Sequence, residues 1–150
     1  MTQALPSVPA MTSITSAAIV RRLQEQVFSH DGDLAVIDEF VADDYVDHTV
    51  PPEFAHGREA FRALAEHWRT AIPDIRVEVE QVLAEGDLVA LAWRGTGTHL
   101  GELMGIPATG RQGATSGISI SKVVDGRVVE RWGNSDDLGL LRHLGVVPEA

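Results

Sequence analysis

Residues 75–99, IRVEVEQVLA-EGD-LVALAWRGTGTH, decide the fold of this chain. The first ten of these positions begin as a strict alternation of apolar and polar side chains, which is typical of a half-buried β-strand. Glu85, Gly86 and Asp87 then form a turn into a second, more apolar segment, LVALAW. Two strand-like runs joined by a short turn that contains glycine predict a long antiparallel hairpin.

Two more strands are predicted downstream of this hairpin. A loop rich in glycine and proline spans residues 100–113, and the strand-like segment SGISISKVV follows at 116–124. The dipeptide Asp125-Gly126 predicts a tight turn into RVVERWGNSD, residues 127–136. A final short helix over residues 137–145, DLGLLRHLG, ends the ordered pattern.

Upstream of residue 75 the apolar period changes from two to about 3.6, which predicts three helices. The first is capped by Ser13 or Ser16 and runs to about residue 29. Asp33 caps a short second helix, and the third runs from near Gly57 to Ala71, before Pro73. The inward-facing positions of the three helices are Ile19, Leu23 and Val27, then Leu34, Ile37, Phe40 and Val41, then Phe61, Leu64, Ala65, Trp68 and Ile72.

Helices followed by a meander of strands predict an α+β fold and not alternating βαβ units. We expect one domain over residues 14–150, because no internal repeat or linker interrupts the pattern. The segment before it, residues 1–13, contains two prolines among small residues and is expected to be a flexible tail. It lacks the basic and apolar stretches of a signal peptide or a membrane anchor.

Charge and cysteine content narrow the possible partners and sites. The 22 acidic residues outnumber the 12 lysines and arginines, for a formal net charge of -10. Such a surface repels nucleic acid and anionic membranes, so neither is expected as a partner. The chain has no cysteine, which excludes disulfides, thiolate nucleophiles and zinc–thiolate sites and suits a reducing cytoplasm.

The segment LVALAW is apolar on both of its alternating faces. One face of an antiparallel strand is covered by the helices or the pocket, so the other face needs a second cover. A second copy of the sheet is the simplest cover, and we therefore expect a homodimer.

The last predicted strand carries the most informative polar residues. Side chains alternate along a strand, so Glu130, Trp132, Asn134 and Asp136 share one face. An aromatic, an amide and a carboxylate in line are typical of a pocket wall. The alternative is that Asp136 and Asp137 only cap the helix that follows, and one aspartate can cap while its neighbour faces the pocket.

Two histidines are further candidates. His99 ends the hairpin in GTGTH, and His48 lies just after Tyr45 in YVDH. Each is either a catalytic or ligand-binding group or a structural hydrogen-bonding partner. No two histidines have the spacing of metal ligands, so no metal site is predicted.

Five segments in this order resemble the SnoaL-like polyketide cyclases of the nuclear-transport-factor-2-like superfamily. They are YVDH, GDLVA, GTHLGELMGIPATG, DGRVVERW and DLGLLRHLGVVP, and the likeness covers roughly residues 14–148. The resemblance implies a cone-shaped barrel, a curved antiparallel sheet packed on three N-terminal helices with an internal pocket. It also implies a role in antibiotic biosynthesis.

The resemblance also implies a chemistry: cofactor-free acid/base catalysis on a polyketide-like carbonyl substrate, as in an aldol cyclisation. Asp136, four residues after Trp132, corresponds to the general acid/base of those cyclases. We expect burial beside Trp132 to raise the pKa of that carboxyl, and Asn134 with His99 to hold the developing enolate oxygen. Residues predicted to contact the substrate are Trp132, Asn134, His48, Tyr45 and Trp68.

Other activities stay open for the same pocket. The polar segment GNSDD, residues 133–137, departs from the pattern of the cyclases and suits more oxygenated chemistry. The alternatives are a polyketide hydroxylase, an epoxide hydrolase or hydratase, and a non-catalytic protein that binds a small apolar molecule.

Overall fold

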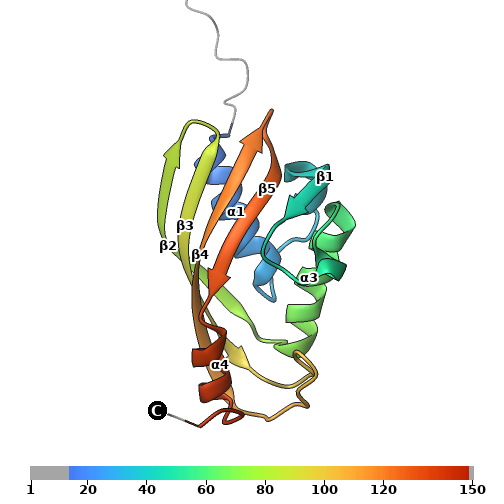
Figure 1. Cartoon of the computed structure of the whole chain (residues 1–150), viewed down its shortest axis with the longest axis vertical. Coiled ribbons are helices and arrows are strands. Elements are labelled where there is room, and N and C mark those ends of the chain that lie inside the picture. Colours follow the sequence, from blue (N-terminus) through green and yellow to red (C-terminus); the bar gives the residue numbers. More distant parts are fainter. Residues whose placement is uncertain (1–13, 149–150) are drawn as a thin grey trace, which may run out of the picture.

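The predicted hairpin lies at one side of a curved five-stranded sheet (Figure 1). A computed structural model describes residues 14–148 of the chain. Strand β2 (Arg76–Glu85) pairs antiparallel with β3 (Leu88–Thr98), in continuous register except for an irregularity between Val79 and Gln81. The sheet order is β1-β5-β4-β3-β2, so β2 is one edge. The tail proposed for residues 1–13 lies outside the described residues.

The two strands predicted downstream complete the antiparallel part of the sheet. Strand β4 (Gln112–Val124) pairs with both β3 and β5 (Arg127–Ser135), and Asp125 and Gly126 adopt positive φ angles of 51° and 77° in the turn. Strand β4 begins four residues earlier than the sequence predicts. Residues 112–115 pair with β3 but carry small and polar side chains. The apolar alternation that predicts a strand therefore starts only at residue 116.

Three helices precede the hairpin and cover the concave side of the sheet, as predicted (Figure 1). They are α1 (Ser16–Phe28), α2 (Val36–Phe40) and α3 (Arg58–Ala71). The cap of α1 is Thr15, whose side chain accepts a hydrogen bond from the Ala18 backbone N–H at 3.1 Å, between the two predicted caps. The core therefore lies between these helices and the inner face of the sheet.

The sequence does not predict strand β1 (Val41–Asp47), which extends the sheet beyond β5. Val41 was expected on the inner face of the second helix, but it is the first residue of β1, and α2 ends at Phe40. The pairing of β1 with β5 is parallel, and its register shifts between Val41 and Val46. This irregularity puts exposed Asp43 and Asp44 side by side and hides the period of two.

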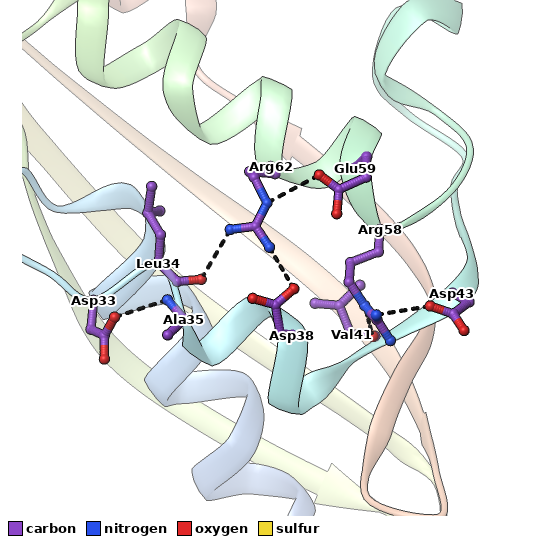
Figure 2. A network of polar contacts seen from close by, with 9 residues as sticks. All are labelled: Asp33, Leu34, Ala35, Asp38, Val41, Asp43, Arg58, Glu59 and Arg62. Atoms are coloured by element: carbon purple, nitrogen blue, oxygen red, sulfur yellow. Dashed lines mark hydrogen bonds and ion pairs between the residues drawn. The ribbon is translucent and has the colours of Figure 1, made fainter.

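Arginine side chains fasten α3 to the segments around it. Arg62 donates to an Asp38 carboxylate oxygen at 2.6 Å and pairs with Glu59 at 3.2 Å (Figure 2). One turn earlier, Arg58 donates to the Val41 carbonyl at 2.8 Å and pairs with Asp43. These contacts hold α2 and the start of β1 against α3.

Two shorter elements complete the chain. A 3₁₀ turn, η1 (Pro52–Phe54), leads into α3, and helix α4 (Asp137–His143) follows β5 and packs on β4. Within residues 14–148, no helix is both long enough and apolar enough to cross a membrane.

Candidate active site

The concave face of the sheet leaves a cavity of about 610 Å³ between the strands and the helices. Its wall is mostly apolar, and this is the composition usual for a pocket that takes a small organic molecule. The large apolar residues that line it include Phe28, Phe54, Leu64, Trp68, Ile72, Val77 and Trp93. Of these, Trp68 was predicted to contact a substrate, and the structure places it in the cavity wall.

Glycines on the inner face of the sheet let side chains of the cavity wall pack closely against the strands. Gly95 and Gly97 of β3 and Gly113 of β4 line it directly. A side chain at Gly97 would place a Cβ only 2.2 Å from Ile72 on the opposite wall. The absence of a side chain at Gly97 therefore lets Ile72 pack directly against the strand.

A short row of polar residues on β5 faces the cavity. Arg131 and Ser135 line it, as does Asp137 just after the strand, and Gly133 lies between the first two. The Ser135 hydroxyl donates to a carboxylate oxygen of Asp137 at 2.7 Å. These residues were not predicted, because the pocket was expected on the opposite face of the strand, with Trp132 and Asn134.

Arg131 belongs to a buried polar network that joins β5 to β1. Its Nη1 lies 3.0 Å from a carboxylate oxygen of Asp47, whose side chain is 1% exposed. The Tyr45 hydroxyl donates to the same carboxylate at 3.0 Å, and the Thr49 backbone N–H and hydroxyl both donate to its other oxygen. Burial raises the pKa of the Tyr45 phenol well above its usual value, so this hydroxyl remains a donor at neutral pH.

His67 on α3 contributes an imidazole to the cavity wall. Its ring lies 5.7 Å from the Phe54 ring and 6.5 Å from the Trp68 ring, centroid to centroid. These three side chains form an aromatic wall opposite the sheet. His67 was not predicted to line the pocket, because a histidine beside an apolar helix position is more typical of a solvated side chain.

The predicted residues of β5 do share a face, but it is the convex face. Trp132 and Asn134 are exposed, and neither is among the residues that line the cavity. Alternation along a strand determines which side chains share a face. The curvature of the sheet determines which of the two faces borders the cavity. The expectation that Trp132 and Asn134 line the pocket is therefore corrected.

His48 joins Trp132 on that convex face. The two rings stack at 4.8 Å and 10°, and His48 Nε2 lies 3.2 Å from a carboxylate oxygen of Glu130. Tyr45, two positions earlier than Asp47, points inward instead and is only 1% exposed. The structure thus brings His48, Trp132 and Glu130 together, but away from the cavity.

Asp136 lies at the cavity rim and caps α4. Its carboxylate accepts the Gly139 backbone N–H at 2.9 Å, and its side chain is exposed. Its neighbours Ser135 and Asp137 both line the cavity, while Asp136 itself does not. The strand ends at Ser135, so alternation no longer fixes the direction of the side chain at 136, and the expected burial beside Trp132 is corrected.

His99 is completely buried and lies outside the cavity lining. Its Nδ1 accepts a hydrogen bond from the Thr109 backbone N–H at 3.2 Å, which ties the end of β3 to the following loop. Its Nε2 is buried without a hydrogen-bond partner among the described residues. The expectation that His99 lines the cavity is not met.

Within residues 14–148, no group of three histidine, aspartate or glutamate side chains is arranged to hold a metal ion. The polar groups that the cavity offers are those of acid/base chemistry and hydrogen bonding: a guanidinium, carboxylates, hydroxyls and an imidazole.

The cone-like α+β architecture and its enclosed cavity define a nuclear-transport-factor-2-like protein. The sequence profile of the SnoaL-like polyketide cyclases matches residues 18–144, and the chain belongs to this family.

Three Streptomyces proteins illustrate what this chain is similar to. The aklanonic acid methyl ester cyclase DnrD of Streptomyces peucetius is 30% identical over 138 residues, which cover 87% of this chain and 91% of that protein. The crystal structure of IdmH, a candidate polyketide cyclase of Streptomyces antibioticus, has a TM-score of 0.76 and 33% identity, covering 89% and 100% of the two chains. AclR, a candidate hydroxylase of Streptomyces galilaeus, has a TM-score of 0.74 and 31% identity, covering 91% and 86%.

Proposed function

We propose that this protein is a cyclase that closes a carbon ring in a polyketide methyl ester, without a cofactor. The observation that carries the proposal is the mostly apolar cavity of about 610 Å³, whose polar lining includes Arg131 and Ser135 of β5, Asp137 of α4 and His67 of α3. Its size falls within the range usual for pockets that hold small organic molecules. The similarity to DnrD, an aklanonic acid methyl ester cyclase, supports this substrate class.

The reaction that fits these groups is an intramolecular aldol addition. A base removes a proton from carbon flanked by two carbonyls, the enolate carbon attacks a ketone of the same molecule, and the new alkoxide takes a proton back. One C–C bond forms and no electrons are exchanged with another reactant. Positioned acid/base catalysis and electrostatic stabilisation each contribute roughly 2–4 kcal/mol to such a step.

Asp136 is the acid/base of this proposal, on the strength of its place four residues after Trp132. Its carboxylate is now the cap of α4, and releasing a cap costs only about 1 kcal/mol. This cost is smaller than the typical gain from a positioned acid/base, and catalytic contacts often tighten only in the substrate complex. Asp136 also lies between Ser135 and Asp137, which both line the cavity.

The test is incubation of the purified protein with aklanonic acid methyl ester, followed by chromatographic separation of substrate and product and mass spectrometry of each. A cyclised product of unchanged mass supports the proposal. A product that has gained oxygen contradicts it and favours the second candidate, a hydroxylase, to which the similarity with AclR points. Labelled water and labelled O₂ then identify the source of that oxygen, and tight binding without turnover indicates a binding protein.

We further propose a homodimer built on the convex face of the sheet. Strand pairing aligns Leu83, Ala90, Ile120 and Trp132 in one row across four strands. Three of these side chains are exposed, Leu83 to 74%, and Ile118 beside them is 64% exposed. A contiguous apolar face of this kind is typical of a protein–protein interface, and a second copy can present the same face to it. The cytoplasm is our proposal for where this dimer acts.

A further inference from the structure

Arg131 is the cation of the cavity wall, and its orientation is fixed by buried partners. The side chains of Arg131 and Asp47 are 14% and 1% exposed, and Nη1 lies 3.0 Å from the carboxylate. Tyr45 donates to the same carboxylate oxygen as Arg131, and Thr49 donates to the other oxygen. Asp47 therefore restricts the guanidinium to one position.

The guanidinium lies across Gly133, the next inward position of β5. A Cβ at Gly133 would come within 3.2 Å of the Arg131 Cζ and both terminal nitrogens. Any other residue there would have to displace the guanidinium by a few tenths of an ångström or more. Because Gly133 has no side chain, the planar guanidinium can lie flat against the strand at the edge of the cavity.

Arg131 keeps hydrogen-bond donors free for a ligand. Among the described residues, only its Nη1 has a protein acceptor, its Nε and Nη2 are not among the fully buried unpaired atoms, and the residue lines the cavity. Asp47 already balances the positive charge, so the site does not require a full anion. Its chemistry suits a neutral carbonyl oxygen that becomes negatively charged during a reaction.

The separation along β5 fits such a reaction. Gly133, under the guanidinium, and Ser135, which holds Asp137 at 2.7 Å, are two residues apart on the strand, or about 7 Å. This spacing matches the length of one enolisable unit, whose C–H would lie near the carboxylates at the β5–α4 junction and whose oxygen would lie near the guanidinium.

We propose that Arg131 is the substrate-contacting group that binds the carbonyl oxygen of the enolisable unit and stabilises the enolate. Asp47 and Tyr45 are positioning residues that act through it. This inference rests on the proposed cyclase function and adds to it the residue that receives the developing charge.

The experiment uses benzoylacetone, an aromatic β-diketone whose enol and enolate absorb differently, and requires no turnover. Bound to the wild-type protein, this probe is expected to ionise at a pH lower than in water, by about one unit, because the guanidinium favours the enolate. In Arg131→Gln, the titration midpoint of the bound probe should return most of the way to its value in water. In Arg131→Lys, part of the downward shift should remain. Arg127→Gln, on an exposed position of the same strand, is the control and should titrate as wild type does.

Arg131→Gln leaves the Asp47 carboxylate buried without its partner, which can destabilise the fold. The double variant Asp47→Asn with Arg131→Gln removes both charges and provides a folded alternative. An unshifted titration in the wild type, no binding of the probe, or an equal shift in the double variant would overturn the assignment. A shift that depends on Arg131, in a protein that does not cyclise aklanonic acid methyl ester, would keep the enolate site and refute only the cyclase function.

Discussion

Two neighbouring aspartates at the end of β5 have different surroundings. Asp136 caps α4 through the Gly139 N–H, whereas Asp137 lines the cavity and accepts the Ser135 hydroxyl. The family resemblance assigns the acid/base to Asp136. Substitution of each in turn separates the two roles, because asparagine is nearly isosteric with aspartate.

We expect Asp136→Asn to lower the turnover of aklanonic acid methyl ester roughly a hundredfold or more, the usual scale for loss of a general acid/base. Asp137→Asn, with the same loss of charge one residue away, should have a much smaller effect. Circular dichroism and the urea midpoint check that both variants are folded. A larger loss in Asp137→Asn would move the acid/base to the carboxylate that already faces the cavity.

At the scale of elements, polar side chains join segments that are distant in sequence. Arg69 near the end of α3 donates to the carbonyls of Gln26 and Val27, in the last turn of α1, and of Gly32, at 2.7 to 3.0 Å. Carbonyls of a last helical turn have no partner inside their own helix. The α3 arginines drawn in Figure 2 tie the same helix to α2 and β1.

The contacts of Arg69 predict a measurable stability difference. We expect Arg69→Leu to lower the free energy of unfolding by about 2–3 kcal/mol, because hydrogen bonds to a charged group are lost and helix carbonyls lose their donor. Arg21→Leu is the matched control: its 55% exposed side chain pairs with Glu25 in the same helix, which is worth only about 0.3–0.5 kcal/mol, and its contact with the Val79 carbonyl is long, at 3.5 Å. Urea denaturation that finds equal losses would contradict this.

Asp74 joins the start of β2 to the end of β3. Thr98 donates its backbone N–H and its hydroxyl to the two carboxylate oxygens at 2.6 and 2.7 Å. These bonds, the backbone one first, lower the pKa of Asp74 from its ordinary value of 3.8. Because the carboxyl is more acidic in the folded state, its stabilising effect is complete above the ordinary value and is lost as the pH falls through the lowered one.

This linkage can be measured by thermal unfolding as a function of pH. The stability advantage of the wild type over Asp74→Asn should be constant near neutral pH and shrink below about pH 5. Thr98→Val, which removes only the hydroxyl bond, should show part of the same pH dependence. An advantage that is independent of pH would show that the carboxylate contributes through packing alone.

The hairpin, the later strands and the three helices follow from the sequence because their apolar periods are regular over many residues. Strand β1 does not, since its register shift places Asp43 and Asp44 together on the exposed side. The site was harder to predict. Alternation correctly grouped Trp132 with Asn134, but no local pattern tells a concave face from a convex one, and Arg131 was therefore missed.

At the scale of the whole molecule, the curvature of the sheet divides its residues between two tasks. The concave face carries glycines and a row of polar groups around the cavity. The convex face carries Ile118, Ile120 and Trp132, which are 64%, 41% and 37% exposed. The residues of the two faces have separate explanations. Small residues on the concave face suit the cavity, whereas large apolar residues on the convex face suit a contact with another protein surface.

The convex face predicts the oligomeric state in solution. We expect light scattering at micromolar concentration to give about twice the 16.2 kDa chain mass for the wild type. The variant with Ile118→Lys and Ile120→Lys should be monomeric, because two charges at the centre of a two-fold interface meet their own copies. Val146→Lys, at an apolar position that is 41% exposed and lies outside the sheet, should stay dimeric. A monomeric wild type refutes the dimer, and a double variant that stays dimeric while folded places the interface elsewhere than on the sheet.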